Sequence, residues 1–269
     1  MPENTEHGFD AAVRLEAAGN GRYIGHTSKL YWNFVGPFGG ITAATALNSL
    51  LQREDRLGDP LSLTVNFMAP IKEGAFFLDT KVLRSNRSTQ HWSVQLAQER
   101  EAEPALAALA VFAVRRDTWG LREAVQPQAP APGECRKFNP KLEILWPQMY
   151  EMRYARGRFG VENPDSVTHC WLRDNPPRPL DFPSLTAICD AFFPRIFLRR
   201  PQMAPIATVS LNVYFHVDAA ELAKEGDGPV LCVAKAQVFN KGYYDQEGQV
   251  WGRDGKLLAT TQQVAWYKE

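Results

Sequence analysis

The sequence predicts an α+β fold built as a tandem duplication, in which a long central helix is wrapped by an antiparallel β-sheet in each half. Three observations support this fold class. An apolar helical segment followed by several alternating strands occurs twice along the 269 residues. The first strand after each helical segment reads almost alike, "SLTVNFM" at 62–68 and "SLNVYFH" at 210–216. A proline-rich stretch at 117–147 lies between the two halves, so we expect units at 1–116 and 148–269 joined by a linker.

The elements of the first half follow from local patterns. Two short strands are predicted around a Gly-Asn-Gly turn, and a small-residue helix follows them. Four extended stretches complete the half. The last is assigned to a strand because it follows a predicted turn at Glu103–Pro104 and faces three other predicted strands. The predicted ranges are strands 11–19 and 21–28, helix 39–53, and strands 61–70, 75–85, 91–100 and 105–116.

The second half repeats the same order. Strand 207–217 alternates cleanly, with Leu211, Val213 and Phe215 on an apolar face and Thr208 and Ser210 on a polar one. The predicted ranges are strands 149–157 and 168–174, helix 184–193, and strands 207–217, 229–240, 243–252 and 256–268. A helix as apolar as either of these must be covered by its sheet.

The composition limits the classes of partner and compartment. Thirty basic residues balance thirty acidic ones, so the chain has no charge excess that would attract nucleic acid or an anionic membrane surface. No apolar run approaches the roughly 20 residues that cross a bilayer, and the N-terminal stretch lacks the pattern of a signal peptide. We therefore expect a cytoplasmic protein that binds neither nucleic acid nor membranes.

The cysteines and histidines do not predict a metal centre. The four cysteines form no CxxC pair, and the five histidines show no HExxH spacing. We therefore interpret the cysteines as reduced thiols and expect no bound metal. The sequence also lacks a GxSxG motif, so no covalent nucleophile stands out.

Two glycines stand at the start of the first predicted helix. Gly39 and Gly40 follow "GPF" and precede a run rich in Ala and Leu, although glycine costs a helix roughly 1 kcal/mol relative to alanine. One interpretation is that a substrate approaches the backbone N–H groups there. The other is that the start of the helix packs tightly against the sheet. The sequence leaves both open.

Asp190 is the only charged residue between Asp181 and Arg195, and it lies beside the apolar stripe of the second predicted helix. A carboxylate at the margin of such a stripe either faces solvent or is a general base in a partly dry cleft. The end of the chain adds a second polar anomaly, "TTQQ" at 260–263. Aligned by sequence, its counterpart in the first half is the apolar "LAVF" at 109–112, so that Gln263 replaces a phenylalanine.

The order of a helix Asp, "ATVSLNVYFH" and "LLATTQQ" resembles the second half of the acyl-CoA thioesterase II family, and "GPFGG" and "RSNRS" resemble its first half. The resemblance covers nearly the whole chain and implies a tandem double hotdog fold. In that family an Asp, a Thr and a Gln hold the water that attacks the thioester. The matching positions are Asp190, Thr208 and Gln263.

Three departures accompany this resemblance. An extra segment, 219–228, separates Thr208 from the glutamines, and register errors of one residue leave Gln262 as an alternative to Gln263. Thr208 also lies on the polar face of its predicted strand, whereas the helix packs on the apolar face. A bulge, or the end of the strand at this point, would remove the conflict, and the sequence shows neither.

The resemblance implies hydrolysis of acyl-CoA without a metal or organic cofactor. Asp190 would act as the base, Thr208 and Gln263 would hold the water, and Gly39 and Gly40 would meet the thioester. Phe38 and Phe193 would line the acyl site. We expect acyl-CoA as the small-molecule partner, and a homodimer, because long strands leave sheet edges that pair.

Two alternatives to hydrolysis remain at this point. A hotdog enoyl-thioester hydratase or dehydratase would need a catalytic histidine, and His216 is the candidate, eight residues along the strand from Thr208, or roughly 26 Å at the rise of a strand. A non-catalytic acyl-CoA-binding protein would keep the fold without turnover. Release of free thiol from acyl-CoA separates it from an enzyme.

Overall fold

The structure is a computed structural model that describes residues 6–99, 102–139 and 144–268. Residues 1–5, 100–101, 140–143 and 269, which include parts of the expected N-terminal unit, the strand expected at 91–100 and the linker, lie outside the described residues. The description below concerns the three described ranges.

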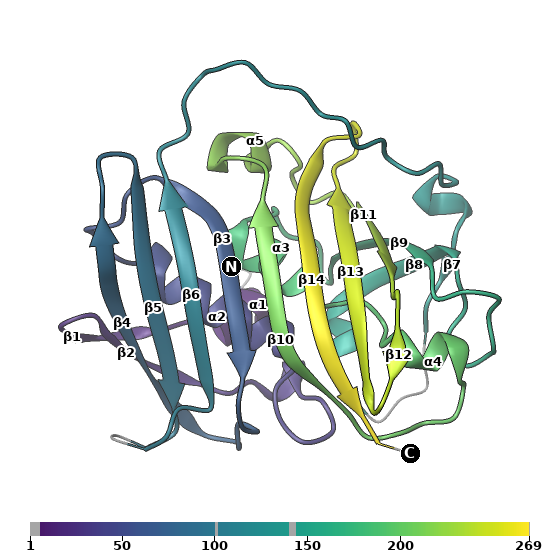
Figure 1. Ribbon diagram of the computed structural model, residues 1–269, viewed down its shortest axis with the longest axis horizontal. Helices are drawn as coiled ribbons and strands as arrows, with labels where there is room; N and C mark the ends of the chain where they lie inside the picture. The colour runs from purple at the N-terminus through teal and green to yellow at the C-terminus, as the bar shows by residue number, and fades with distance from the viewer. Residues whose placement is uncertain (1–5, 100–101, 140–143, 269) are drawn as a thin grey trace, which may run out of the picture.

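The first half contains one well-formed helix and a set of antiparallel strands (Figure 1). The helix expected at 39–53 is confirmed as α2, and the strand expected at 105–116 is confirmed as β6. The expected strand at 11–19 is wrong in its first part, because Phe9 and Ala12 pack into the core from a short helix there. The elements are α1 (Gly8–Ala12), β1 (Glu16–Gly19), β2 (Arg22–His26), the 3₁₀ helix η1 (Lys29–Tyr31), α2 (Gly39–Leu51), β3 (Asp59–Phe67), β4 (Ala75–Ser85), β5 (Thr89–Ala97) and β6 (Leu106–Ala113).

The second half has shorter helices and a similar set of strands. Its elements are η2 (Pro132–Glu134), β7 (Arg136–Lys137), η3 (Trp146–Met149), β8 (Tyr150–Arg156), β9 (Thr168–Asp174), α3 (Phe182–Ile188), α4 (Ile196–Arg199), β10 (Ile206–Phe215), α5 (Ala219–Ala223), β11 (Val230–Lys235), β12 (Phe239–Asn240), β13 (Tyr243–Trp251) and β14 (Leu257–Tyr267).

The helix expected at 184–193 is wrong beyond Ile188, where α3 ends. Pro194 disfavours the helical conformation at the residue before it, and Phe193 leaves the helical path to pack in an aromatic cluster. The chain therefore turns at Cys189 and Asp190 and forms the separate one-turn helix α4 after Arg195.

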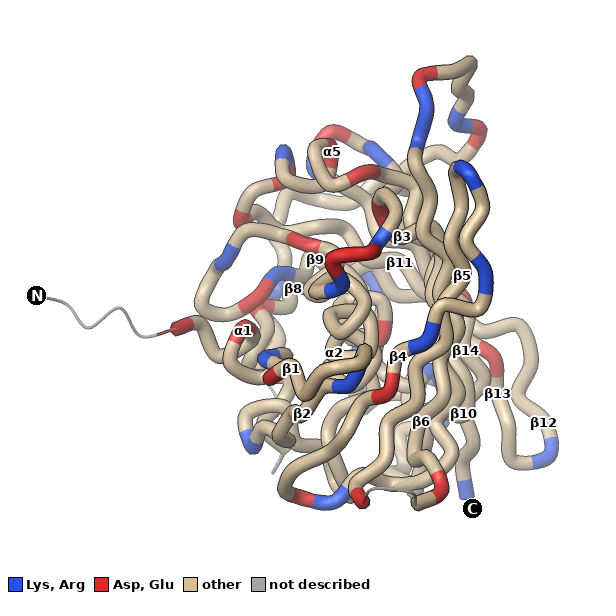
Figure 2. The backbone as a smooth tube through the Cα atoms, turned by 90° about the vertical axis from the view of Figure 1, so that its left-hand side faces the viewer, with Lys and Arg blue, Asp and Glu red and all other residues tan. Residues whose placement is uncertain are grey.

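All the strands join one 14-stranded sheet, and every pair in it is antiparallel. The order is β1-β2-β4-β5-β6-β3-β10-β14-β13-β11-β9-β8-β7, with β12 beside β13. Outward from β3 the strands are β6, β5, β4, β2 and β1, and outward from β10 they are β14, β13, β11, β9 and β8. Each strand of one half therefore has a counterpart at the same place in the other half, and β7 extends the second half by one strand. The sheet bends around α2 (Figure 2), and α3 packs against α2.

The central pair relates the two halves by an approximate two-fold axis. Ser210 pairs with Asn66, and Ser62 pairs with Tyr214, so that aligning 62 with 210 maps one pair onto the other. The same alignment, followed one strand outward, corrects the counterpart of Gln263. Leu63 pairs with Ala110, and Leu211 pairs with Gln263, so the counterpart is Ala110 and not Phe112.

The segment 117–147, which was expected to be a surface linker, is exposed in its first part and buried in its last part. Its first part crosses the top of the sheet between β6 and β7 (Figure 1), and Trp119 and Val125 are exposed there. Its last part enters the core, where Trp146 stacks on Phe38 at a ring separation of 4.3 Å. In the described ranges, no helix is both long and apolar enough to cross a membrane.

Candidate active site

Asp190 lies in the turn that ends α3. Its N–H donates to the Ala187 carbonyl at 3.1 Å, and the Ala191 N–H donates to the Ile188 carbonyl at 3.0 Å. Hydrogen bonds to the carbonyl three residues earlier, as in a 3₁₀ helix, tighten the end of the helix. The Asp190 side chain is 7% exposed, and its carboxylate meets the start of α2 instead of the solvent.

The start of α2 is built to receive that carboxylate. A side chain at Gly39 would place its Cβ 2.7 Å from Oδ2 of Asp190, so only glycine leaves this space open. The Gly40 N–H donates to the Asp190 carboxylate. The first N–H groups of a helix have no partner within it, and the helix dipole favours an anion there. Asp190 is thus an N-terminal anion for α2.

Gly40 serves a second purpose, the close packing of the two helices. A Cβ at Gly40 would lie 2.6 Å from the Ala187 carbonyl oxygen of α3 and 2.5 Å from the Phe38 ring. Both glycines therefore allow close packing in this structure, against α3 and the turn that follows it, and the approach of a substrate to their N–H groups stays a prediction. Gly39 makes room for the Asp190 carboxylate, and Gly40 makes room for the backbone of α3.

Gln263 reaches Asp190 from β14. Its Nε2 donates to Oδ1 of Asp190 at 2.7 Å and to the Cys189 carbonyl at 3.4 Å. Gln263 is 6% exposed, whereas Gln262 is exposed on the opposite face of the sheet. The structure thus brings Asp190 together with Gln263 and places Gln262 away from them.

Thr208 is turned toward the inner face by a β-bulge in β10. The register shifts between Thr208 and Ser210, so that Thr208 pairs with the buried Ala265. Directly paired residues share a face, and Thr208 is therefore on the side of Gln263. Within the described residues its hydroxyl forms no hydrogen bond, so Thr208 shares the inner face with Gln263 but does not bond to the Asp190–Gln263 pair.

Burial dominates the electrostatics of Asp190. Loss of solvent raises the pKa of its carboxyl to about 7, although the hydrogen bonds from Gln263 and from the Gly40 N–H act in the opposite direction. A carboxylate with a pKa near neutrality can both take up and release a proton at physiological pH.

Arg195 anchors the turn that carries Asp190, and sequence patterns did not single it out. Its guanidinium is fully buried and donates to the Phe193, Ser166 and Ala234 carbonyls and to the Thr168 hydroxyl. These acceptors belong to the turn, to β9 and its preceding residues, and to β11. Arg195 therefore ties the end of the Asp190 turn to the sheet.

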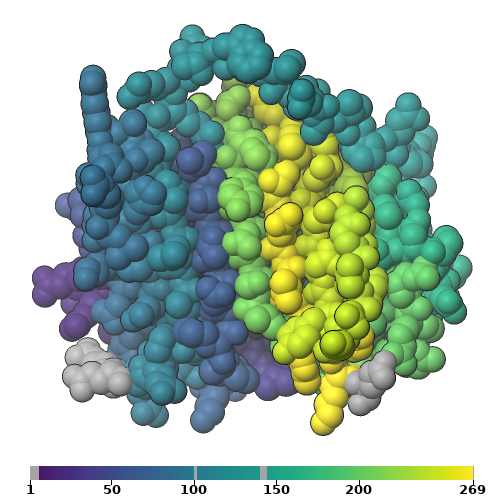
Figure 3. All heavy atoms as spheres, viewed as in Figure 1, coloured from purple at the N-terminus to yellow at the C-terminus, as the bar shows by residue number. Residues whose placement is uncertain are grey.

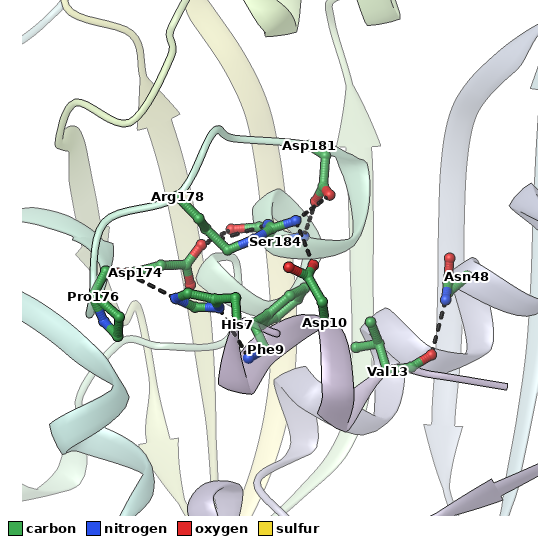
Figure 4. A network of polar contacts seen from close by, with 10 residues as sticks. All are labelled: His7, Phe9, Asp10, Val13, Asn48, Asp174, Pro176, Arg178, Asp181 and Ser184. Carbon is green, nitrogen blue, oxygen red and sulfur yellow. Dashed lines mark hydrogen bonds and ion pairs between the residues drawn. The ribbon is translucent and has the colours of Figure 1, made fainter. Parts of the chain in front are cut away.

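A second polar network holds the other end of α3 (Figure 4). Arg178 bridges Asp10 and Asp181 at 2.7 Å each, and the Ser184 hydroxyl donates to Asp174 at 2.6 Å. Burial raises the pKa of the Asp174 carboxyl to about 6. This network joins α1 to the start of α3 and thereby fixes the helix whose far end carries Asp190.

Phe38 and Phe193 are both buried next to the site. Phe38 is the residue before α2 and packs on Trp146 and Tyr150. Phe193 follows the Asp190 turn and packs in a cluster with Phe138, Tyr154 and Phe159.

Among its described residues, the first half of the chain has no equivalent of the polar pair. Thr42 and Thr186 make the same hydrogen bond to the carbonyl four residues earlier, at 3.3 and 2.8 Å, which aligns α2 with α3. Asp190 then corresponds to Ala46, just as Gln263 corresponds to Ala110. Both alanines are buried. The described residues therefore contain this Asp–Gln arrangement once.

The residues considered for other chemistries lie elsewhere. His216 is exposed and contacts the Thr260 hydroxyl at 3.0 Å, on the opposite side of the sheet from Asp190. Among the residues with described placement, no group of three or more His, Cys, Asp or Glu side chains is arranged to hold a metal ion.

Comparisons with known proteins place this geometry in context. Residues 28–113 match the model of the acyl-CoA thioesterase N-terminal domain, and residues 121–267 match that of the acyl-CoA thioesterase C-terminal domain. No curated protein matches the chain.

Solved structures match over nearly the whole chain. A conserved protein of unknown function with a hot dog fold from Alicyclobacillus acidocaldarius is 43% identical, with a TM-score of 0.94, and the match covers 98% of this chain and 99% of that one. An acyl-CoA thioesterase II from Mycobacterium marinum is 16% identical, with a TM-score of 0.78 and coverage of 97% and 98%. The latter shows a likeness of fold alone.

Proposed function

Because the chain belongs to the acyl-CoA thioesterase family, we propose that it hydrolyses acyl-CoA, or a related acyl thioester, to the free acid and the thiol. The observation that carries this proposal is the contact of a buried Asp190 carboxylate with Gln263 at the N-terminus of α2. A buried carboxylate with a raised pKa beside a helix N-terminus combines a base with donors for developing negative charge.

We also propose that the two halves are two hotdog units in tandem, residues 1–116 and 148–269, joined by the segment 117–147. The repeated strand order about β3 and β10 supports this arrangement. The matched threonine hydrogen bonds in α2 and α3 support it as well. Ala46 and Ala110 replace the polar pair in the first unit. We therefore propose one reacting centre per chain, in the second unit.

The reaction begins with a water held between Asp190, Gln263 and Thr208. Asp190 removes one proton from this water while the oxygen of the water bonds to the thioester carbonyl carbon, which gives a tetrahedral oxyanion. The carbon–sulfur bond then breaks, and Asp190 returns the proton to the departing thiolate. The products are the carboxylic acid and the free thiol, so the atoms and the proton balance.

The oxyanion is assigned to the start of α2. The Gly40 N–H is already bonded to Asp190, so the Gly39 N–H is the donor that we assign to the thioester oxygen, aided by the helix dipole. Gly39 also borders the Phe67 ring, since a Cβ there would lie 3.4 Å from it. The thioester would therefore enter between Phe67 and the Asp190 turn.

The acyl group is assigned to the apolar segments around this entrance. Phe34 and Val35 precede α2 and are 59% and 71% exposed, and Met68 follows β3 at 51%. The two segments touch where Gly36 approaches the Ile71 backbone. We propose that they admit the substrate, while Phe38 and Phe193 line the inner end of the acyl site.

The adjacent glutamines offer a matched test of the function. Gln263→Ala should lower thiol release from a panel of acyl-CoAs by roughly ten- to a hundred-fold, because it removes a group that orients the water and the base. Gln262→Ala on the opposite face should keep the wild-type rate. Thiol release is followed with a chromogenic thiol reagent, and binding with a non-hydrolysable acyl-CoA. Wild-type protein that binds the analogue but releases no thiol from any member of the panel would overturn the proposal in favour of a binding protein.

The two glycines should separate catalysis from packing. Gly39→Ala should lower kcat by roughly tenfold or more, because its Cβ would displace Oδ2 of Asp190 and small misplacements are costly. Gly40→Ala should instead destabilise the fold by about 1–3 kcal/mol, because its Cβ meets the backbone of α3. Thermal melting and kcat of the folded fraction are measured for both. Equal losses of rate and stability in the two variants would contradict this division.

A further inference from the structure

The second half interrupts its helix at a place where the first half continues. In the alignment of α2 with α3, Asp190 corresponds to Ala46, inside the 13-residue helix α2, and Arg195 corresponds to Leu51, its last residue. The helix α3 has seven residues and ends before Asp190. Asp190 is therefore carried by a turn, whereas its counterpart is held by the regular hydrogen bonds of a helix.

The backbone of this turn forms few hydrogen bonds of its own. After Ala191, neither Phe192 nor Phe193 forms a backbone–backbone hydrogen bond in the described ranges. Their rings are packed, since Phe192 lies against Gly248 of β13 and Phe193 lies in the aromatic cluster. Buried backbone groups without backbone partners need side chains to bind them.

The side chain that binds this backbone is that of Arg195. Its Nε and Nη2 donate to the Phe193 carbonyl at 2.9 and 2.6 Å. Its Nη1 donates to the Thr168 hydroxyl at 2.7 Å, and to the Ser166 and Ala234 carbonyls at 3.0 and 3.1 Å. The guanidinium thus joins the turn to β11 and to the start of β9. Acceptors in several directions suit the rigid fork of arginine and not the single ammonium of lysine.

The buried charge of Arg195 has no acidic partner. The side chain is 0% exposed, and the titratable groups that act on it within the described residues are Tyr154, Tyr244 and Cys170, with no Asp or Glu among them. A buried cation without a counter-ion is costly. The first half places the partly buried, apolar Leu51 at the corresponding position. The fold therefore does not require this cation, and the turn that it holds explains its presence.

The turn places the Asp190 carboxylate among three neighbours. Its Oδ2 faces Gly39, the Gly40 N–H donates to it, and Nε2 of Gln263 donates to Oδ1 at 2.7 Å. Gln263 reaches it from the inner face of the sheet, while β10, β14 and β13 form a continuous surface on the outer face (Figure 3). A turn that moved away from this position would change all three contacts and admit bulk water to the carboxylate.

We propose that Arg195 is a positioning residue, which acts through the turn to hold the Asp190 carboxylate against the start of α2 and away from bulk water. This inference rests on the proposed function, because the position of Asp190 affects a reaction only where Asp190 is the base. Arg195 itself is assigned no contact with the substrate. It controls both the rate of the reaction and the pH at which the base ionises.

The groups that face Asp190 decide what its pH dependence reports. The Cys189 thiol of the same turn, the Tyr150 hydroxyl of β8 and the Tyr244 hydroxyl of β13 interact with its charge. Burial raises the pKa of all three groups, so none of them titrates near neutral pH. Among the described residues, α2 and β14 add neutral donors, the Gly40 N–H and the Gln263 amide. Asp190 is therefore the group that titrates, and its desolvation is what the anchor maintains.

The pH profile of Arg195→Lys tests the proposal. Lysine keeps the positive charge but cannot bind all the acceptors at once, so the turn should loosen. The plateau of kcat/KM for acyl-CoA hydrolysis should fall by roughly tenfold or more, because a misplaced base is inefficient. The midpoint of its acid limb should move down by roughly one pH unit or more, because hydration lowers the pKa of a buried carboxyl. Lost folded protein would lower the plateau without moving the midpoint.

Arg115→Lys is the matched control. Arg115 also donates to backbone carbonyls, those of Phe215 and Pro60, but it does so at the end of β10 that lies opposite Thr208. This variant should keep the midpoint of the wild type even where its stability falls. A wild-type midpoint in folded Arg195→Lys, or the same shift in both variants, would overturn the proposal.

An NMR titration of the Asp190 carboxyl separates this inference from the proposed function, because it requires no turnover. Isotope-labelled aspartate supplies the signal, and Asp190→Asn identifies it by its disappearance. The titration midpoint should fall by roughly one pH unit or more in Arg195→Lys. Thr168→Val, which removes one acceptor of the guanidinium, should shift it in the same direction and replaces Arg195→Lys if that variant does not fold. A wild type that releases no thiol would overturn the proposed function, whereas an unchanged titration in the folded variant would overturn the anchor.

Discussion

Asp190→Asn should lower kcat/KM for acyl-CoA hydrolysis by at least a hundredfold at pH 8. Asparagine keeps the shape of the side chain and can still accept the hydrogen bond from Gln263, but it cannot remove a proton from water. A positioned general base contributes about 10²–10⁴-fold. Binding of a non-hydrolysable acyl-CoA should be retained, so the loss should appear in kcat.

The pH dependence gives this prediction a second measurement. In the wild type kcat/KM should rise with pH to a plateau above about 7, because the free enzyme must have Asp190 ionised. Asp190→Asn should lack that rise, and Asp79→Asn, at an exposed carboxylate paired with Arg22, should behave as wild type. Hydrolysis by Asp190→Asn at the wild-type rate would exclude the proposed mechanism.

The strands and α2 were predictable because their patterns are local. Alternation of apolar and polar residues in β3 and β10 reflects one buried face, and the small-residue run after Gly40 is a helix buried on nearly all sides. The end of α3 was not predictable in the same way. Its apolar stripe continues through Phe192, but the side chains that follow Ile188 pack on residues far away in sequence, among them Phe138.

The register of the sheet was the second limit. One inserted residue reverses the face of every side chain beyond it, and the sequence does not show where a bulge lies. The bulge beside Val209 turns Thr208 to the inner face, against the alternation expected for 207–217. The counterpart of Gln263 moves by two residues for a different reason, because pairing between strands and not sequence similarity sets it.

From the sequence, the candidate site could be predicted only from polar residues in otherwise apolar segments. A single charge in an apolar helix and two glutamines in a strand drew attention to Asp190 and Gln263, and the resemblance to a family supplied their order. The contacts of Asp190 with the start of α2 could not be anticipated, because they depend on how two helices pack. Arg195 was missed because most of its partners are backbone carbonyls, which leave no trace in side-chain patterns.

Asp190 should also make the fold less stable at high pH. Its carboxyl has a pKa of about 7 in the folded chain and about 4 in an unfolded one. A raised pKa means that the folded state holds the proton more tightly than the unfolded state does. The resulting stability is present in full below pH 4 and is lost as the pH rises through 7. Above that pH the folded chain must hold a desolvated carboxylate.

Asp190→Asn should remove this pH-dependent cost while it abolishes catalysis. Between pH 5 and pH 8 the free energy of unfolding of Asp190→Asn, minus that of wild type, should increase by roughly 2–3 kcal/mol, the value that a shift from about 4 to about 7 implies. Urea unfolding of both proteins at the two pH values measures it, and all other titrating groups cancel in the difference. Asp79→Asn should show no such increase, since its carboxylate is exposed. A difference that stays constant from pH 5 to pH 8 would mean that Asp190 is ionised throughout this range, and that burial at the start of α2 does not tune it as a base.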